Sequence, residues 1–579
     1  MAWRYDAPLR EMRFVIERVL DAPASWARCA AFADLDLATA GAVLEEGARF
    51  ASGVLLPLNA SGDREGCTLR DGDVTMPAGF RDAYRALVDG GWPALACSAE
   101  WGGQGLPLLL DAALREMMAA CNHGFMMAAD VLHGAYETIK AHGSTELKSR
   151  YLAKVASGEW PAAMALTEPQ AGSDLGALRT RALLQPDGSL RITGSKIFIS
   201  GADHDLADNI VHLVLCRLQD ASGSAPAGSK GLSLALVPKI LPDGSRNAWV
   251  VDSLEHKLGL HASPTCALHY EGATGWLLGE PNRGLAAMFL MMNSARLHVG
   301  LQGLGHQEIA TQNAVRHAFE RVQLKAPIAT TPAMRQLLLR LQAQTEGQRV
   351  IAYAAALAID EAAHHEDPAR RERQSRRAAL LTPIIKALLT QTGFETASAA
   401  LQVFGGYGYT REFGIEQCLR DVRITMVYEG TNEIQAIDLL QRKVLGDGGL
   451  ALDELLADLE GEAARAGVLP DGQAFAAALR AQIAEARSTT AAIQAAAAND
   501  AEAPLRVADA YLQGLSFLML TWAWAASARA IIGETDTAFA ASKRARVRHG
   551  IDWLLPEAAA HWAQARATDT PLAKLDPTH

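Results

Sequence analysis

The run "LRITGSKIFIS", residues 190 to 200, decides the fold of this 579-residue chain. Apolar and polar residues alternate along it, which is the two-residue period of a half-buried β-strand. Comparable runs, "NIVHLVLCRL", "LSLALVP" and "CALHYEG", follow before residue 283 and are separated by stretches rich in Gly, Pro, Asp and Ser. The pattern predicts a β domain that begins near residue 161 and is inserted in a mainly helical protein.

The flanking sequence has the helical period instead. Leu9, Met12 and Ile16 recur at steps of three and four residues, and three long helical runs follow Gly284. "VLGDGGL", residues 444 to 450, breaks this pattern, and the sequence beyond it is alanine-rich and helical. We therefore expect a mainly α protein with four units: helical 1–160, β 161–283, a helical bundle 284–446 and a C-terminal helical domain 447–579.

The charge balance argues against a nucleic-acid partner. The chain has a formal net charge of −11 and a pI near 5.8, whereas binding a phosphate backbone requires clustered Lys and Arg. One dense basic run, "SKRARVRHG", contains Lys543, Arg544, Arg546 and Arg548. We interpret this run as a solvated helix face.

Cysteine usage and the N-terminal sequence point to the cytoplasm. The seven cysteines form no CxxC motif, and the first twenty residues carry frequent charges without an apolar signal core. Residues 510 to 528 contain no charge and approach the length of a membrane span, but they include several polar residues and many alanines. We expect a helix buried in a bundle or subunit contact, with a membrane-surface contact as the weaker alternative.

Familiar catalytic and metal motifs are missing from the sequence. No GxGxxG opens a helix after a strand, and no GxSxG or HExxH occurs. The 16 histidines form no ligand set with cysteine, so we expect no metal site.

A turn rich in small and polar residues, "ALTEPQAGSDLG" (165 to 176), is a candidate ligand site. Gly172 lets the backbone approach a ligand closely, while Ser173 supplies a hydrogen-bonding hydroxyl. In "KIFISG", Phe198 and Ser200 lie on the same face of a strand because alternate residues point the same way. This face suits a flat ring system.

A second candidate site is Glu429 in "MVYEGTNEIQAIDLL", residues 426 to 440. The glutamate follows an apolar-aromatic run that can desolvate it, which would raise its pKa and make it a stronger base. Gly430 permits a sharp turn, and Asn432 with Gln435 resembles a capping box at the start of a helix. From these residues alone, a solvated turn glutamate remains an alternative.

Taken in order, the motifs resemble the acyl-CoA dehydrogenase family as far as about residue 446. They are "ALTEPQAGSD", "KIFIS", "NSARLHVGLQG", "ERVQ", "QVFGGYGYTRE" and "MVYEGTNEIQ". "EHKLG", "MFLMMNSARL" and the long tail are similar to the large bacterial branch with an additional C-terminal helical domain, which includes 3-methylmercaptopropionyl-CoA dehydrogenase-like proteins. Gln170, Phe198 and a short segment after "ERVQ" depart from the common family pattern.

The resemblance implies an FAD site between the β domain and the helices. The cofactor positions that it implies are Leu166, Thr167, Gly172, Ser173, Phe198 and Ser200, then Arg321, Gln323, Gln402, Gly405 and Gly406 reaching a neighbouring subunit's cofactor, and Thr431 and Glu433 closing the site. It also implies substrate contacts at Ser173, Asn293, Arg296 and Gly430.

The resemblance further implies a reaction. Glu429 would remove the α-proton of an acyl-CoA thioester while hydride passes from the β-carbon to flavin N5, giving a trans-2-enoyl-CoA. The expected partners are an electron-transfer flavoprotein and further copies of the chain, as a dimer or tetramer. An acyl-CoA oxidase, which uses oxygen, is an alternative, and a DNA-binding flavoprotein of the same fold is a weaker one.

Overall fold

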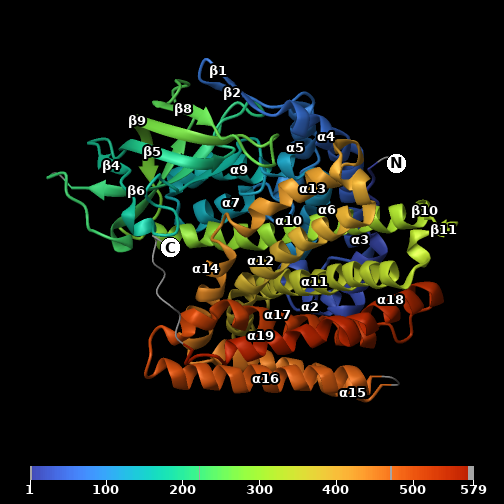
Figure 1. The fold of residues 1–579 in the computed structure, drawn as a ribbon. Coiled ribbons are helices and arrows are strands. Elements are labelled where there is room, and N and C mark those ends of the chain that lie inside the picture. Colours follow the sequence, from blue (N-terminus) through green and yellow to red (C-terminus); the bar gives the residue numbers. More distant parts are fainter. Residues whose placement is uncertain (1–2, 221, 470–471, 571–579) are drawn as a thin grey trace, which may run out of the picture. The chain divides into compact units, whose positions relative to one another are not determined.

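A computed structural model describes residues 3–220, 222–469 and 472–570 (Figure 1). Contacts between residues divide the chain into two compact units. We call Glu45–His298 the barrel unit, and the described residues up to Leu44 together with those from Val299 onward the bundle unit. The units differ in secondary structure and are considered one at a time.

A small β-barrel dominates the barrel unit. Strands β6, β4, β5, β9 and β7 pair in that order, and β7 pairs again with β6, which closes the ring. β3 pairs with β6, and β8 pairs with β9. The strands are β3 (Ala162–Ala165), β4 (Arg181–Leu184), β5 (Leu190–Ser200), β6 (Val211–Gln219), β7 (Leu232–Pro238), β8 (Trp249–Leu254) and β9 (Thr265–Leu277).

The alternation in sequence predicted the four longer strands of this barrel. β5 covers the whole of "LRITGSKIFIS", and the inward side chains of these strands, including Ile192, Val214 and Leu268, form the buried core. The short strands β3, β4 and β8 were not predicted, because four to six residues carry little periodic signal. A hairpin of β1 (Thr68–Arg70) and β2 (Asp73–Thr75) also interrupts the region that was predicted to be helical.

Helices complete the barrel unit. They are α4 (Leu56–Glu65), α5 (Phe80–Asp89), α6 (Leu108–Met126), α7 (Leu132–His142), α8 (Thr145–Leu147) and α9 (Ala153–Ser157). Every residue of α6 is buried, and the helix is kinked at Asn122, whose side-chain oxygen accepts a hydrogen bond from the Phe125 N–H at 2.9 Å. The kink therefore has a local cap.

Three long helices form the frame of the bundle unit, as the sequence predicted. They are α10 (Gly284–Glu320), which begins within the barrel unit, α11 (Pro332–His364) and α12 (Pro368–Phe404). Thr331 and Asp367 cap α11 and α12, each followed by a proline at the first helical position. The shorter helices are α1 (Leu9–Phe14), α2 (Ala22–Trp26), α3 (Leu37–Phe50, which crosses between the units), α13 (Ile415–Val422) and α14 (Asn432–Ile437).

The C-terminal extension, as we call the helices after residue 449, belongs to the bundle unit. Its helices are α15 (Leu450–Gly467), α16 (Gln473–Ala497), α17 (Ala503–Ala530), α18 (Thr537–His549) and α19 (Ala558–Ala565). Figure 1 shows α17 beside α16 and α19, and α17 also packs against α11. The Trp524 indole N–H donates to the Ala343 carbonyl at 3.0 Å, and the absence of a side chain at Gly347 makes room for that ring.

The uncharged run of residues 510 to 528 lies within α17 and is almost entirely buried, which confirms the prediction of a helix inside a bundle. In the described part of the chain, no helix is both long enough and apolar enough to cross a membrane. All seven cysteines are free thiols, and six of them are buried. Burial raises the pKa of the Cys67 thiol to about 12.

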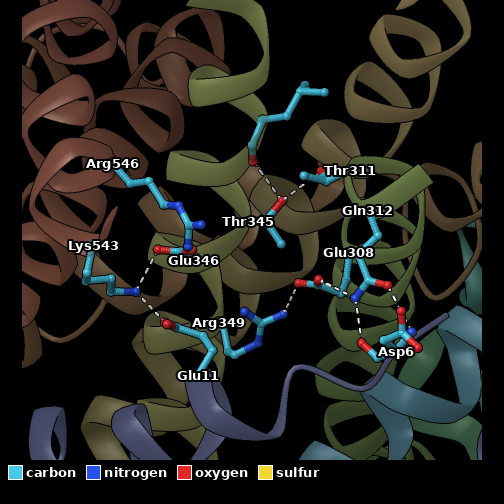
Figure 2. A network of polar contacts seen from close by, with 11 residues as sticks. Asp6, Glu11, Glu308, Thr311, Gln312, Thr345, Glu346, Arg349, Lys543 and Arg546 are labelled. Atoms are coloured by element: carbon cyan, nitrogen blue, oxygen red, sulfur yellow. Dashed lines mark hydrogen bonds and ion pairs between the residues drawn. The ribbon is translucent and has the colours of Figure 1, made fainter. Parts of the chain in front are cut away.

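The interpretation of the basic run as a solvated face is wrong for Lys543. Its side chain is 1% exposed and its ammonium lies between the carboxylates of Glu11 and Glu346, with 2.8 Å to the latter (Figure 2). Arg546 also pairs with Glu346. Because α18 packs against α11, charges that look solvated in sequence instead meet buried acids, and only Arg544 and Arg548 remain exposed.

Candidate functional site

The 166–174 turn follows β3 in the barrel unit. Glu168 and Ala171 pair through both backbone hydrogen bonds, at 3.0 and 2.9 Å, which folds the turn tightly. Gly172 and Ser173 lie exposed beyond it, and a Cβ added to Gly172 would meet no atom within 4 Å. The backbone at Gly172 is therefore open to a ligand.

A buried lysine fastens this turn to the barrel. Lys196 of β5 is 0% exposed, and its ammonium donates to the Leu166 carbonyl at 2.8 Å, the Leu215 carbonyl at 2.8 Å and Glu168 Oε1 at 2.9 Å. One side chain thus joins β5, β6 and the 166–174 turn. Reasoning from sequence missed Lys196, because nothing local marks a strand lysine as buried.

Glu168 completes this anchor. Its carboxylate also accepts from the backbone N–H groups of Arg179 at 2.7 Å and Thr180 at 2.9 Å. Burial raises the pKa of Glu168, but the Lys196 ammonium and these hydrogen bonds outweigh it and lower the pKa to about 2. Gln170, a departure from the family pattern, donates to Glu168 Oε2 at 2.7 Å and so reinforces the same turn.

Phe198 and Ser200 stand at the end of β5. The register with β9 shifts between Lys196 and Ile199, and Phe198 adopts a left-handed φ of 60° in this bulge. Phe198 is 58% exposed, Ile199 is buried and Ser200 is half-buried. Both predicted contact residues therefore lie opposite the buried Ile199, and the Ile197 N–H ties the bulge to the Thr167 carbonyl at 2.9 Å.

Besides Ser173, the barrel unit contains two predicted substrate residues, and both lie on α10. Asn293 is exposed and Arg296 is buried, three residues further along the same helix. Residues at this spacing are neighbours on a helix surface. They therefore form one local patch, with one member facing solvent.

In the bundle unit, Glu429 lies between a 3-10 turn (Arg423–Met426) and α14, which places it at a loop-to-helix junction. Its side chain is half-buried, and its φ is 56°. Gly430 follows with a φ of 88°. A non-glycine residue in the left-handed region costs about 1 to 2 kcal/mol, and such strain is concentrated at functional sites.

Two buried glutamines hold this loop. The Tyr428 hydroxyl donates to Gln302 Oε1 on α10. The Gln435 amide nitrogen on α14 donates to the carbonyl oxygens of Glu429 and Gly430, each at 3.2 Å. Gln302 and Gln435 are both fully buried, so the loop is fastened at its start and at its centre.

The predicted capping box at Asn432 is wrong. Thr431 is the capping residue, and its hydroxyl accepts from the Ile434 N–H at 3.4 Å. Asn432 lies in the first turn of α14, and its side-chain oxygen accepts instead from Lys386 at 3.0 Å and Thr390 at 3.2 Å on α12. A hydrogen bond from the Thr431 side chain is the main cause that lowers the pKa of Glu433.

The remaining predicted cofactor residues gather where α10 and α12 end. The Arg321 guanidinium lies 5.4 Å from the centre of the Tyr407 ring, and Gly405 ends α12 with a φ of 61°. Arg321, Gln323, Gln402, Gly405 and Gly406 are all exposed, and a Cβ added to either glycine would meet no atom within 4 Å. Phe319, Tyr407 and Tyr409 of the same helix ends also have exposed rings, and we call these three residues together with the five above the aromatic patch.

Another polar region of the bundle unit contains none of the predicted site residues. A cavity of about 420 Å³ is lined by Glu11, Glu308, Glu346, Arg349 and Arg546, among others (Figure 2). Arg349 pairs with Glu308, and Arg546 with Glu346, so its charges largely neutralise one another. Within the described residues, no group of His, Cys, Asp and Glu is arranged to hold a metal ion.

Comparison with family models matches the chain almost from end to end. The N-terminal, middle and C-terminal domains of acyl-CoA dehydrogenase match residues 41–159, 163–273 and 282–445. A model described as acetyl-CoA dehydrogenase C-terminal like matches residues 453–576.

Individual relatives agree with these models. The chain is 42% identical to the 3-methylmercaptopropionyl-CoA dehydrogenase of Ruegeria pomeroyi, over 89% of this chain and 88% of that protein. Its fold is similar to that of Caenorhabditis elegans ACDH-11 in complex with C11-CoA (TM-score 0.78, 19% identity, 95% and 91% of the two chains). It is also similar to a Bacillus anthracis acyl-CoA dehydrogenase complexed with FAD (TM-score 0.76, 21% identity, 96% and 91%).

Proposed function

Because the chain belongs to the acyl-CoA dehydrogenase family, we propose that Glu429 is the catalytic base that removes the α-proton of an acyl-CoA thioester. The observation that carries this proposal is the conformation of Glu429. It is a half-buried carboxylate in a left-handed backbone, in a loop that two buried glutamines hold. The reaction is an FAD-dependent dehydrogenation to a trans-2-enoyl-CoA.

The residues of the barrel unit fit the flavin cofactor of this family. Thr167, Ser173 and Ser200 supply hydroxyl groups, the backbone at Gly172 is open, and the exposed Phe198 ring offers a flat apolar surface. When bound, FAD accepts the hydride that leaves the β-carbon of the substrate. We assign Leu166 and these residues to the cofactor, with Thr431 and Glu433 closing the site.

The proton transfer is the task of the chain itself. The half-buried setting of Glu429 removes part of its water, which favours a base strong enough for a thioester α-proton. Its backbone N–H donates to the thioester oxygen as negative charge grows there. The α-proton passes to the carboxylate and the hydride leaves the β-carbon. A double bond then joins the α- and β-carbons. Asn293, Arg296, Ser173 and Gly430 contact the substrate in this proposal.

Glu429→Gln tests the assignment. The variant keeps the size of the side chain but cannot take the proton, so we expect normal folding and FAD content with turnover reduced by about 100- to 10,000-fold. Glu412→Gln, at an exposed carboxylate of the same unit, is the matched control and keeps wild-type turnover. Near-normal turnover of Glu429→Gln would place the base elsewhere.

The acyl group and the electron acceptor are tested together. The relative from Ruegeria pomeroyi is named for 3-methylmercaptopropionyl-CoA, so that thioester is the first substrate to compare with straight-chain acyl-CoAs. We propose an electron-transfer flavoprotein as the acceptor. Bleaching of the flavin by the acyl-CoA under anaerobic conditions, followed by rapid reoxidation by electron-transfer flavoprotein and only slow reaction with oxygen, supports a dehydrogenase. Rapid reoxidation by oxygen with stoichiometric peroxide would identify the oxidase alternative.

We also propose that the protein is a homo-oligomer through the aromatic patch, where Arg321, Gln323, Gln402, Gly405 and Gly406 reach the cofactor of a neighbouring copy. Tyr409 is 86% exposed, and exposed aromatic clusters are typical of interfaces.

Arg321→Ala is expected to reduce both FAD content and oligomer assembly, measured by flavin absorbance and elution volume in gel filtration. Arg411→Ala, at another exposed arginine of this region, is the control. Unchanged flavin content and size in Arg321→Ala would refute the assignment.

A further inference from the structure

We propose that Gln435 is a positioning residue for the reaction, which sets the orientation of the Glu429 and Gly430 peptides and thereby of the catalytic carboxylate. This inference rests on the proposed role of Glu429. The Gln435 side chain is 0% exposed and donates to two consecutive carbonyl oxygens, those of Glu429 and Gly430, each at 3.2 Å. Both acceptors are carbonyls, so only the NH₂ end of the amide can face them.

Two adjacent carbonyls converge on one nitrogen because of the backbone conformation. In a strand, successive carbonyls point in opposite directions, and in a helix they run parallel to the axis. Here Glu429 and Gly430 both have left-handed φ values, 56° and 88°, and both of their carbonyls face Gln435 on α14. A glutamine amide has two donor hydrogens, one for each of them.

The orientation of the two carbonyls also determines where the N–H groups of the same peptides point. In a trans peptide the C=O and N–H groups point in opposite directions. With the two carbonyls held on Gln435, the N–H groups of Gly430 and Thr431 point away from it. The direction of the Glu429 Cα–Cβ bond follows from the same backbone angles. Relaxation of Glu429 to a right-handed conformation, which costs less strain, would swing its carboxylate away.

The support for Gln435 is rigid. It lies in α14, where its own N–H donates to the Thr431 carbonyl at 3.0 Å, and α14 packs against both α12 and α17. Its side-chain oxygen is buried and has no hydrogen-bond partner among the described residues.

The test separates positioning from folding. Gln435→Met keeps the length of the side chain and removes both donors. We expect kcat to fall about 10- to 100-fold with little change in KM or FAD content, since misplacing a reacting group by about 1 Å has an effect of this size.

The second readout uses a 3-thia-acyl-CoA, in which sulfur replaces the β-carbon. This analogue can lose its α-proton but has no hydride to transfer, so exchange of that proton in D₂O, followed by NMR, reports the base alone and should slow by a similar factor.

The matched control is Gln482→Met. Gln482 is another buried glutamine of the bundle unit, and it accepts from the Trp562 indole at 2.8 Å. We expect the Gln482→Met variant to lose thermal stability without any change in the rate of α-proton exchange. Wild-type exchange in Gln435→Met, with stability lowered as in the control, would overturn the proposal. Near-normal turnover in Glu429→Gln would instead overturn the proposed base, so the two failures are distinguishable.

If Gln435→Met does not fold, a second variant tests the positioning role of Gln435. In Gln435→Glu the introduced carboxyl can donate one hydrogen bond while it is protonated, but its ionised form repels both carbonyls. The proposal therefore expects α-proton exchange, relative to wild type at each pH, to fall as pH rises through the pKa of the introduced group. A constant ratio across that range would contradict it.

Discussion

The 166–174 turn and the 428–430 loop are fastened in different ways. In the turn, a fully buried ammonium, Lys196, bonds a buried carboxylate, Glu168. In the loop, two neutral side chains, Gln302 and Gln435, make the bonds to Tyr428, Glu429 and Gly430. The turn is thus held by an ion pair, and the backbone of the loop is held by amides.

The two regions share one feature, which is a left-handed residue that carries the proposed function. Phe198 has a φ of 60° and Glu429 a φ of 56°, and neither is glycine. In each region the buried anchor lies within a few residues of the strained one: Lys196 precedes Phe198, and Gln435 follows Glu429. Strong local anchoring of this kind can offset backbone strain.

The largest effect should come from breaking the ionic anchor. Lys196→Met leaves the Glu168 carboxylate buried without its ammonium, and removing one partner of such a pair costs about 3 to 5 kcal/mol. We expect the free energy of opening β5, measured by hydrogen exchange of its amides, to fall by this amount. The FAD content should also be reduced. Amides of α14 should be unaffected.

The double variant Lys196→Met/Glu168→Gln controls for the buried charge. It should recover part of the lost stability, because a neutral amide replaces the uncompensated carboxylate. If the single variant loses less than about 1 kcal/mol, the ion pair does not anchor the turn.

An intermediate effect is expected from pH. The pKa of Glu168 in the fold is about 2, below its ordinary value of 4.5, so the stability that it contributes is present above pH 4.5 and is lost as pH falls toward 2. Glu168→Gln should flatten the acid limb of an unfolding titration followed by circular dichroism. An acid limb as steep as that of wild type would show that other carboxylates govern it.

The smallest effect is expected at Thr431, directly after the 428–430 loop. Thr431→Ala removes the cap of α14 and should cost about 1 kcal/mol, while Thr431→Ser keeps a hydroxyl and should cost less. Hydrogen exchange in α14 measures the difference. Equal losses in the two variants would mean that the hydroxyl does not cap the helix.

Local patterns were enough to predict a large part of the molecule. The alternation in "LRITGSKIFIS" predicted β5, and the helical period predicted α10, α11 and α12, because both periods arise from backbone geometry within a single element. The order of the six motifs identified the family. The position of Glu429 before a helix also followed from its neighbours in sequence.

Pairing between distant residues was beyond these patterns. Lys543 looks like one member of a solvated basic run, yet its partner Glu11 lies 532 residues away in sequence. Asn432 is a residue type that often caps helices, but its side-chain oxygen accepts a hydrogen bond from the buried Lys386 on α12. Thr431 caps α14 instead.

The sequence by itself therefore determined the fold class, the family and the residues worth testing, since periodicity and motif order are properties of neighbouring residues. Only the tertiary structure decided which charges are buried and which groups hold the functional turns. Lys196 with Glu168, and Gln435 with Glu429, acquire their roles because folding removes water and brings specific donors to specific acceptors.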